Sequence, residues 1–196
     1  LSGGGLPWDI ASINKERDAQ MLARIKTYAP IIFSLIAAAV FLDSLRYKFT
    51  NAVETQVIFG RLDAWAASFG AGGLFAQTGL FSQYVIGSAE LVASTLFLLG
   101  LFPALRRLQT LAALIAMAVM SGAVSFHLFT PLGIDPNNDG GGLFAMAVTV
   151  WLGSLTLLIF RRDTLFSILG GIRDAILPGV DRAPSSTVTG TQATAV

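Results

Sequence analysis

The chain has 196 residues, of which 54% are hydrophobic and only 13% carry a charged side chain. Soluble domains carry about 25% charged residues, so this composition excludes an ordinary soluble domain and predicts an integral membrane protein. A net charge of +1 argues against a nucleic-acid partner. The chain has no cysteine, which excludes disulfides, thiol catalysis and cysteine-ligated metals.

The first segment, residues 1–27, is polar, with a glycine-rich start and the charged run Lys15–Asp18. Within it, Met21, Leu22 and Ile25 share one helical face. This pattern predicts a short interfacial helix that leads into the membrane.

Four apolar stretches follow, each close to the ~20 residues that a helix needs to cross ~30 Å of hydrocarbon. We expect spans at about residues 28–47, 83–102, 108–129 and 143–160. The sequence therefore predicts an all-α fold, an integral membrane four-helix bundle over residues 28–160.

The segment between the first two spans, residues 48–80, is too polar at its start to cross the membrane. It nevertheless contains spaced apolar side chains and ends near the glycine-rich breaker 70–73. We expect it to form an amphipathic insert on the external face of the membrane.

The C-terminal segment, residues 161–196, is expected to hold an amphipathic helix on the membrane surface and a polar tail. Apolar residues recur in it every three to four positions: Leu165, Ile168, Leu169, Ile172 and Ile176. Residues 181–196 are rich in Ser, Thr and Ala, a composition that does not form a packed core by itself.

Lysine and arginine are divided unequally between the two sides of the predicted bundle. Of the 13, only Arg46, Lys48 and Arg61 lie on the side of the insert. The others lie in the N-terminal segment, the turn after the second span and the C-terminal segment. The positive-inside rule therefore predicts that both termini are cytoplasmic.

Glu90 lies within the second span, where an ionisable side chain costs ~2.5–3.5 kcal/mol and usually faces a partner or a cavity. Asp43 and His127 lie near the outer ends of the first and third spans, and Arg46 and Lys48 lie at the same rim. Two interpretations follow. The cluster forms a polar pocket that moves protons or binds a polar head group such as a quinone ring, or its ion pairs fix the register of the helices.

His127 is the only histidine in the chain. It cannot form a metal site by itself, and a haem between helices normally needs a second strong ligand that is not evident. An interfacial histidine bonded to a backbone carbonyl is the favoured alternative.

The linker before the fourth span resembles the start of a calcium loop. Asp135, Asn137 and Asp139 have the spacing D-x-N-x-D-G, but the twelfth position, which should be glutamate, is Met146. Because Asp, Asn, Pro and Gly are also common turn residues, we expect a turn here in preference to a metal site.

Three short motifs resemble those of the DoxX-like family of small bacterial membrane proteins. They are Lys48-Phe49-Thr50 after the first span, Gly87-x-x-Glu90 in the second, and Ser125-Phe126-x-x-x-Thr130-Pro131 at the end of the third. The first and third are nearest the branch that includes the reactive-chlorine-resistance inner-membrane protein.

This resemblance covers about residues 28–160 and implies a four-helix bundle in the bacterial inner membrane, associated with redox or oxidative-stress functions. One relative is a subunit of a thiosulfate:quinone oxidoreductase, and others are membrane partners of redox enzymes. By position, Lys48, Glu90 and Thr130 are the site residues that the resemblance implies.

The chain contains no complete catalytic set, so we expect a non-catalytic accessory or scaffold subunit of a larger redox or bioenergetic complex, respiratory or photosynthetic. Its terminal extensions and lipid-facing helices would contact other membrane subunits and lipids. The alternative is a quinone-interacting component of an oxidoreductase, with a pocket at Asp43, Glu90 and His127 and a quinone or lipid as ligand. A transporter is least expected, because the inner halves of the spans offer only Ser and Thr.

Overall fold

The structure, a computed structural model, describes residues 10–177, and over this range it contains six α-helices, one short 3-10 helix and no strand. The all-α prediction is confirmed for this part of the chain. The helices are α1 (Ile10–Phe49), α2 (Val53–Ala67), α3 (Gln83–Leu99), η1 (Pro103–Leu105), α4 (Arg107–Phe129), α5 (Gly142–Phe160) and α6 (Arg162–Ile176). The predicted polar tail, residues 181–196, lies outside the described residues.

Three helices of the described chain are long and apolar enough to cross a membrane, namely α1 from Ser12 onwards, α4 and α5. The fourth apolar helix, α3, has 17 residues. At 1.5 Å per residue it is ~25 Å long, against ~30 Å of hydrocarbon. It ends at Leu99, before the expected end of the second span at residue 102, because a turn at Gly100 leads directly into the 3-10 helix that begins at Pro103.

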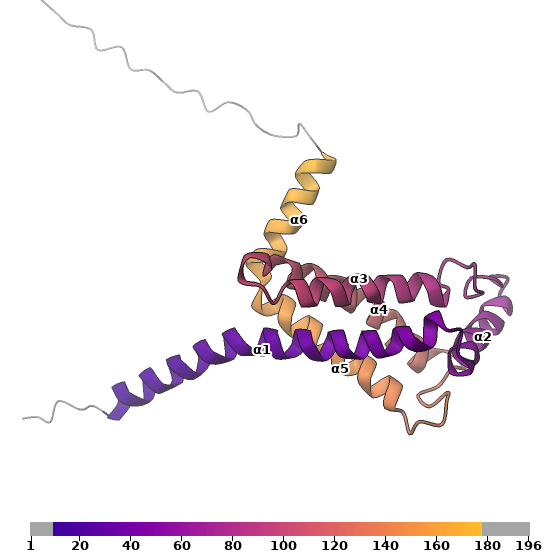
Figure 1. The fold of residues 1–196 in the computed structure, drawn as a ribbon, viewed down its shortest axis with the longest axis horizontal. Helices are drawn as coiled ribbons and strands as arrows, with labels where there is room; N and C mark the ends of the chain where they lie inside the picture. Colours follow the sequence, from indigo (N-terminus) through magenta and orange to yellow (C-terminus); the bar gives the residue numbers. More distant parts are fainter. Residues whose placement is uncertain (1–9, 178–196) are drawn as a thin grey trace, which may run out of the picture.

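The first helix differs from the prediction of an interfacial helix followed by a separate span from residue 28. α1 is one continuous helix of 40 residues, and Pro30 lies inside it. Proline removes one backbone N–H donor, but the residues before it include strong helix formers such as Ala, Gln, Met, Leu, Arg and Lys, which extend the helix back to Ile10. The N-terminal half of α1 projects beyond the other helices, and its axis bends where it leaves them (Figure 1).

The four apolar helices α1, α3, α4 and α5 lie alongside one another, with α1 packed on α3, α3 on α4, and α4 on α5 (Figure 1). Their main core combines small residues with a few large side chains. Its best-buried members are Ala37, Ala38, Phe41, Ala93, Phe97, Ala112, Ala113, Ala116 and Val150. Small residues let helix backbones approach closely, which is how apolar helices pack when water does not drive them together.

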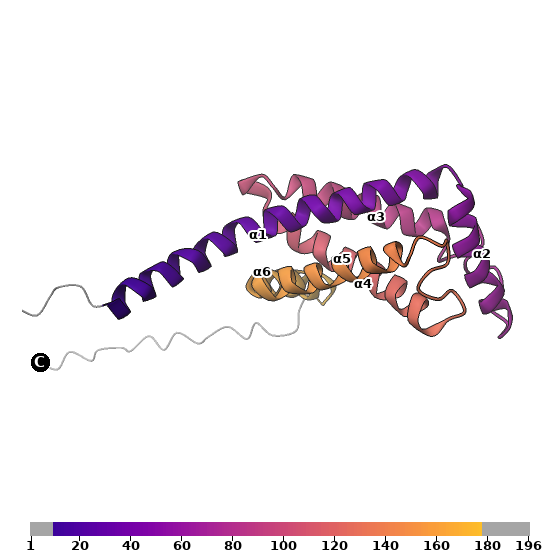
Figure 2. The same cartoon turned by 90° about the horizontal axis from the view of Figure 1, so that it is seen from below.

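The short helix α2 lies across one end of these four helices (Figure 2). A second apolar core at this end joins Leu62 and Ala66 of α2 to Phe75 of the following loop and to Leu132 after α4. The ring of Phe126 packs edge-on against Phe75, with 5.2 Å between the ring centroids. The segment between α1 and α3 is therefore a helix and a loop that fold onto one end of the four apolar helices.

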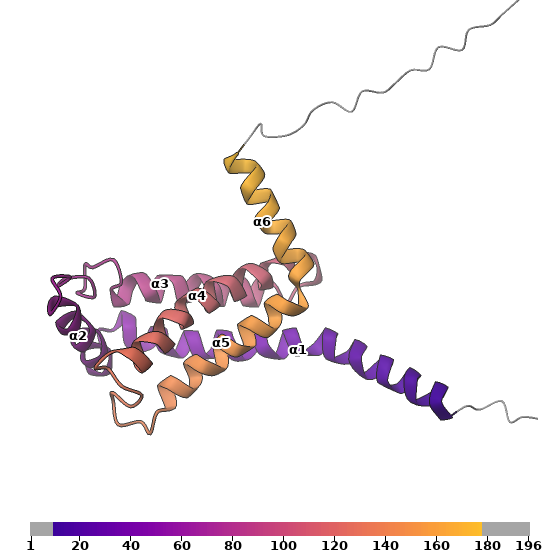
Figure 3. The ribbon, with the colours of Figure 1, turned by 180° about the vertical axis from the view of Figure 1, so that it is seen from behind.

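The last helix, α6, projects away from the opposite end of the bundle (Figure 3). It stands where an amphipathic helix was expected, and none of its residues is buried. Its apolar side chains Phe166, Leu169, Ile172 and Ile176 are exposed. Nothing in the described part of the chain covers this apolar face.

One glycine sets the distance between α1 and α5. A Cβ atom at Gly153 would lie 2.1 Å from Cε2 of Phe33, whose ring packs edge-on against Phe97 at 5.6 Å.

We expect Gly153→Ala to lower the free energy of unfolding by about 1–3 kcal/mol, because the Phe33 ring must leave its place. Gly170→Ala on α6, where a Cβ would meet nothing within 4 Å, is the matched control and should be neutral or slightly stabilising. Thermal unfolding in detergent measures both, and equal melting temperatures would contradict the prediction.

Candidate functional site

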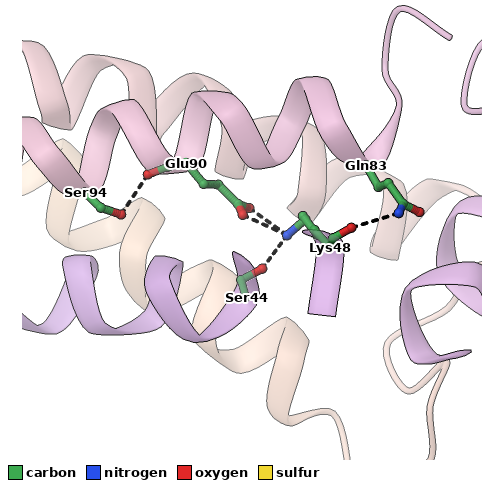
Figure 4. A network of polar contacts seen from close by, with 5 residues as sticks. All are labelled: Ser44, Lys48, Gln83, Glu90 and Ser94. Carbon is green, nitrogen blue, oxygen red and sulfur yellow. Dashed lines mark hydrogen bonds and ion pairs between the residues drawn. The ribbon is translucent and has the colours of Figure 1, made fainter. Parts of the chain in front are cut away.

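The most buried charges of the described chain form an ion pair between the last turn of α1 and the middle of α3 (Figure 4). Lys48 Nζ lies 2.8 Å from Oε2 and 3.0 Å from Oε1 of Glu90. The side chains of Lys48 and Glu90 are 13% and 3% exposed. Nζ also donates to the hydroxyl of Ser44, one helical turn earlier. The charge of Glu90 is thus compensated inside the fold.

A glycine makes room for this contact. A Cβ atom at Gly87 would lie 3.4 Å from Cδ of Lys48 and 3.5 Å from Cζ of Phe49, so the lysine stem lies directly against the backbone of α3. Residues three apart share one helical face, so Gly87 and Glu90 both point towards α1. The two members of the Gly-x-x-Glu motif therefore serve one contact, the glycine by its missing side chain and the glutamate by its charge.

A network of side-chain amides adjoins the ion pair at the end of the bundle. Gln83 is buried, and its Nε2 donates to the carbonyl of Lys48 at 2.8 Å and to Oδ1 of Asn51 at 3.0 Å. Gln56 Nε2 donates to Oε1 of Gln83 at 2.7 Å, and Gln77 Nε2 donates to Asn51 Oδ1 at 3.0 Å. The network holds the turn between α1 and α2 against the first turn of α3.

Sequence analysis missed this amide network, although two signals pointed to it. Asn51 lies two residues after the end of α1 and has a φ of 57°, a left-handed conformation that asparagine adopts more readily than most residues. Gln83 is a polar residue at the very start of an otherwise apolar helix. Neither signal identifies a partner, because the partners come from segments far apart in the sequence.

The structure does not bring the other predicted pocket residues to this pair. Asp43 forms an ion pair with Arg46 at 3.1 Å, and their side chains are 64% and 66% exposed. Five residues separate Asp43 from Lys48, and each residue rotates a helix by about 100°, so the two side chains point about 140° apart around α1. Among residues 10–177, Asp43 and His127 thus bond to partners other than Glu90.

His127 lies in the last turn of α4, and Thr130 is the residue that caps this helix at its C-terminal end. His127 is buried, with Nδ1 2.6 Å from the carbonyl oxygen of Gly133 and its ring 5.6 Å from that of Phe144. Thr130 Oγ1 donates to the carbonyl of Phe126 at 2.6 Å and accepts from the N–H of Leu132 at 3.2 Å. Both side chains bond to backbone groups where the helix ends, and within residues 10–177 neither of them forms a hydrogen bond or ion pair with Glu90.

The acidic linker forms a turn that begins α5. Asp135 Oδ1 accepts from the N–H of Asp139 at 2.7 Å, and Asp139 accepts from the N–H groups of Gly141 at 3.0 Å and Leu143 at 2.8 Å. The bond from Leu143 is the main reason that the pKa of Asp139 is lowered. Asn137 lies in the same turn, but within residues 10–177 no three acidic or histidine side chains come together as a metal site requires.

Comparison of the chain with protein-family models, curated proteins and solved structures finds no match in any of the three. Over the described residues the protein is all-helical, and three of its helices are long and apolar enough to cross a membrane. Its distinctive feature is a closed ion pair between two apolar helices.

The ion pair generates a prediction about stability. We expect Lys48→Met and Glu90→Leu each to lower the free energy of unfolding by about 3–5 kcal/mol, because each leaves a buried charge without its partner. The double variant should recover most of this loss, since an apolar pair can replace a buried ion pair at little cost. Thermal unfolding in detergent provides the measurement, and Asp43→Asn is the control, with an expected change of at most about 1 kcal/mol. Additive losses in the double variant would disprove the coupling.

The turn before α5 generates a second prediction. Asp139→Ala should lower the free energy of unfolding by about 1 kcal/mol, because two N–H groups at the start of α5 lose their acceptor. Since the pKa of Asp139 in the folded protein is below its ordinary value of 3.8, this stabilisation is complete above pH 3.8 and disappears as the pH falls through the folded-state pKa. Melting curves of both proteins from neutral to acid pH should therefore converge at the acid end. A rise in melting temperature on adding calcium would instead indicate a metal site.

Proposed function

We propose that the protein is an accessory subunit of the bacterial inner membrane, a non-catalytic scaffold of a larger redox or bioenergetic complex. Four helices, α1, α3, α4 and α5, cross the bilayer in this proposal, and both termini lie in the cytoplasm. The observation that carries it is the closed Lys48–Glu90 pair, because a charge that is neutralised and 3% exposed is suited to holding helices in register.

The four-span arrangement is supported by the apolar side chains that the helices expose on their outer surfaces. Large apolar side chains are exposed on α3 as well as on the longer helices, among them Val85, Leu91 and Val92. Monomeric soluble proteins rarely expose large contiguous apolar surfaces, whereas lipid solvates them. The apolar residues Leu101 and Phe102, in the turn after α3, continue the apolar stretch towards the ~30 Å that a span requires.

The proposed orientation rests on which helix ends lie together and carry the basic residues. Arg161 after α5 donates to the carbonyl of Arg106 before α4 at 2.8 Å, so these two junctions share one end of the bundle. The long N-terminal half of α1, with Lys15, Arg17 and Arg24, projects from the same end (Figure 1). By the positive-inside rule this end faces the cytoplasm.

Contacts with other subunits are proposed for the two extensions at this end. The side chains of α1 from Ser12 to Tyr28 are exposed, including the apolar Met21, Leu22 and Ile25. The apolar face of α6 is exposed as well. A partner subunit or the membrane surface would cover both.

The DoxX-like resemblance is consistent with a redox assembly, since its motif residues Gly87, Lys48 and Glu90 meet in one contact. A quinone pocket has less support. Glu90 is closed off by Lys48, and the expected neighbours Asp43 and His127 are engaged elsewhere.

Purification of the full-length protein from its native membrane in mild detergent tests the proposal. We expect it to migrate on a native gel in a complex of higher mass, with other membrane proteins in fixed ratio by mass spectrometry. Leu22→Glu should release these partners without changing the melting temperature, whereas Gln20→Glu, on the same exposed part of α1, should retain them.

The Lys48→Met/Glu90→Leu double variant distinguishes the proposed scaffold function from an enzymatic one. In a scaffold the double variant keeps its partners, because an apolar contact replaces an ionic one. A chain that purifies alone with a bound quinone, and whose redox activity is lost in the double variant, would overturn the proposal.

A further inference from the structure

A small crevice opens at the end of the bundle opposite to α2, between α1, the turn after α3 and the end of α5. It has a volume of about 60 Å³. Lys26, Gly100, Arg106, Gln109 and Arg161 contribute to its lining. These residues lie where the apolar helices end and their polar flanks begin.

Three of the lining side chains are cations, and none has a counter-charge in the described structure. Within residues 10–177, neither Lys26 nor Arg106 nor Arg161 has a carboxylate at ion-pair distance. Arg161 is partly buried and donates to the backbone carbonyl of Arg106, which holds the two arginines close together. Burial and the charge of Arg106 both lower the pKa of Arg161. The fold thus concentrates positive charge without neutralising it.

A buried amide beside the crevice is also incompletely bonded. Gln109 is 1% exposed, and its Nε2 donates to Oγ of Ser34 at 3.1 Å, but Oε1 has no partner. If the amide is turned over, Oε1 accepts from the Ser34 hydroxyl and Nε2 becomes a buried donor without a partner, on a side chain that lines the crevice. Gln109 is therefore poised to donate to an acceptor that the chain itself does not provide.

The backbone adds further donors at the same place. Arg106 is the N-cap residue of α4, and no side chain caps the first N–H groups of this 23-residue helix. Gly100 lets α4 begin this close to α3, since a Cβ there would lie 2.8 Å from the backbone nitrogen of Gln109. A helix N-terminus beside two guanidinium groups is a favourable environment for phosphate oxygens.

We propose that this crevice is a phosphate-binding site, occupied by the phosphate of an anionic phospholipid or by free phosphate. Lys26, Arg106 and Arg161 supply the charge, and Gln109 and the first turn of α4 supply hydrogen bonds. The volume of about 60 Å³ limits the group that enters the crevice to a small one such as phosphate. The position at the ends of the apolar helices matches the depth of lipid headgroups, where basic pockets between helices recognise anionic lipids.

The test uses the full-length protein, delipidated in detergent. Its melting temperature is followed during titration with short-chain phosphatidylglycerol, with short-chain phosphatidylcholine and with inorganic phosphate. At a ligand concentration far above the dissociation constant we expect a rise of about 5 °C or more. A rise with phosphatidylglycerol alone identifies a lipid as the source, and a rise with inorganic phosphate identifies the free ion.

Two pairs of neighbouring arginines provide matched controls. Arg161→Gln and Arg106→Gln should each weaken binding about tenfold or more, as loss of a charge-assisted hydrogen bond predicts. Arg162→Gln and Arg107→Gln remove the same charge from exposed positions that do not line the crevice, and they should bind as the unmodified protein does. Lys26→Gln, on an exposed position of α1, provides a further variant if an arginine variant fails to fold.

Phosphorus NMR of the protein as purified gives a second readout, the amount of phospholipid retained. We expect less retained lipid in Arg161→Gln than in Arg162→Gln if the source is a lipid. Equal loss of binding in all four arginine variants would indicate non-specific attraction and overturn the proposal. So would the absence of any ligand-dependent rise in the unmodified protein.

Discussion

The arrangement of the helices depends on the need to neutralise one carboxylate inside an apolar bundle. Glu90 lies on α3 among small and apolar residues, where an uncompensated charge would be costly. Lys48, in the last turn of α1, neutralises the Glu90 carboxylate, and this ion pair sets the position of α1 along α3. Gly87 lets the two helices approach closely enough for this bond. The same contact brings the carbonyl of Lys48 to Gln83, and so connects the ion pair to the turn that leads into α2.

The two ends of the bundle consequently differ in chemistry. At the α2 end, side-chain amides bond to one another and aromatic rings pack into a second core. At the other end, Arg106 and Arg161 lie together with no counter-charge among residues 10–177, and α6 and half of α1 project with exposed apolar side chains. The α2 end thus holds an amide network bonded within the chain, whereas the other end has unneutralised charge and projecting helices available to lipids and other subunits. This contrast is the physical basis for proposing an accessory subunit that assembles through its basic end.

The sequence predicted much of the helical pattern, because apolar runs of this length have few alternatives to a helix. It predicted an interfacial helix that leads into a span from about residue 28, and the structure has one continuous helix there, with Pro30 inside it. It indicated Lys48 and Glu90 as site residues but grouped them with Asp43 and His127, because all lie near the same ends of their predicted spans. Depth along a helix can be read from residue number, but which side chains meet depends on how each helix is rotated and packed against its neighbours.

By itself, the sequence determined that the chain is helical, apolar and rich in small residues. It also showed that Glu90 is the single charged residue between Ala64 and Leu105. These properties follow from composition and local periodicity, which require no knowledge of long-range contacts. Only the tertiary structure decided that Lys48 neutralises Glu90, that Asp43 faces outwards, and that Lys26, Arg106 and Arg161 gather around one crevice. The residues in each of these groups come from different helices or depend on helix rotation, and their meeting is a consequence of packing that no local pattern encodes.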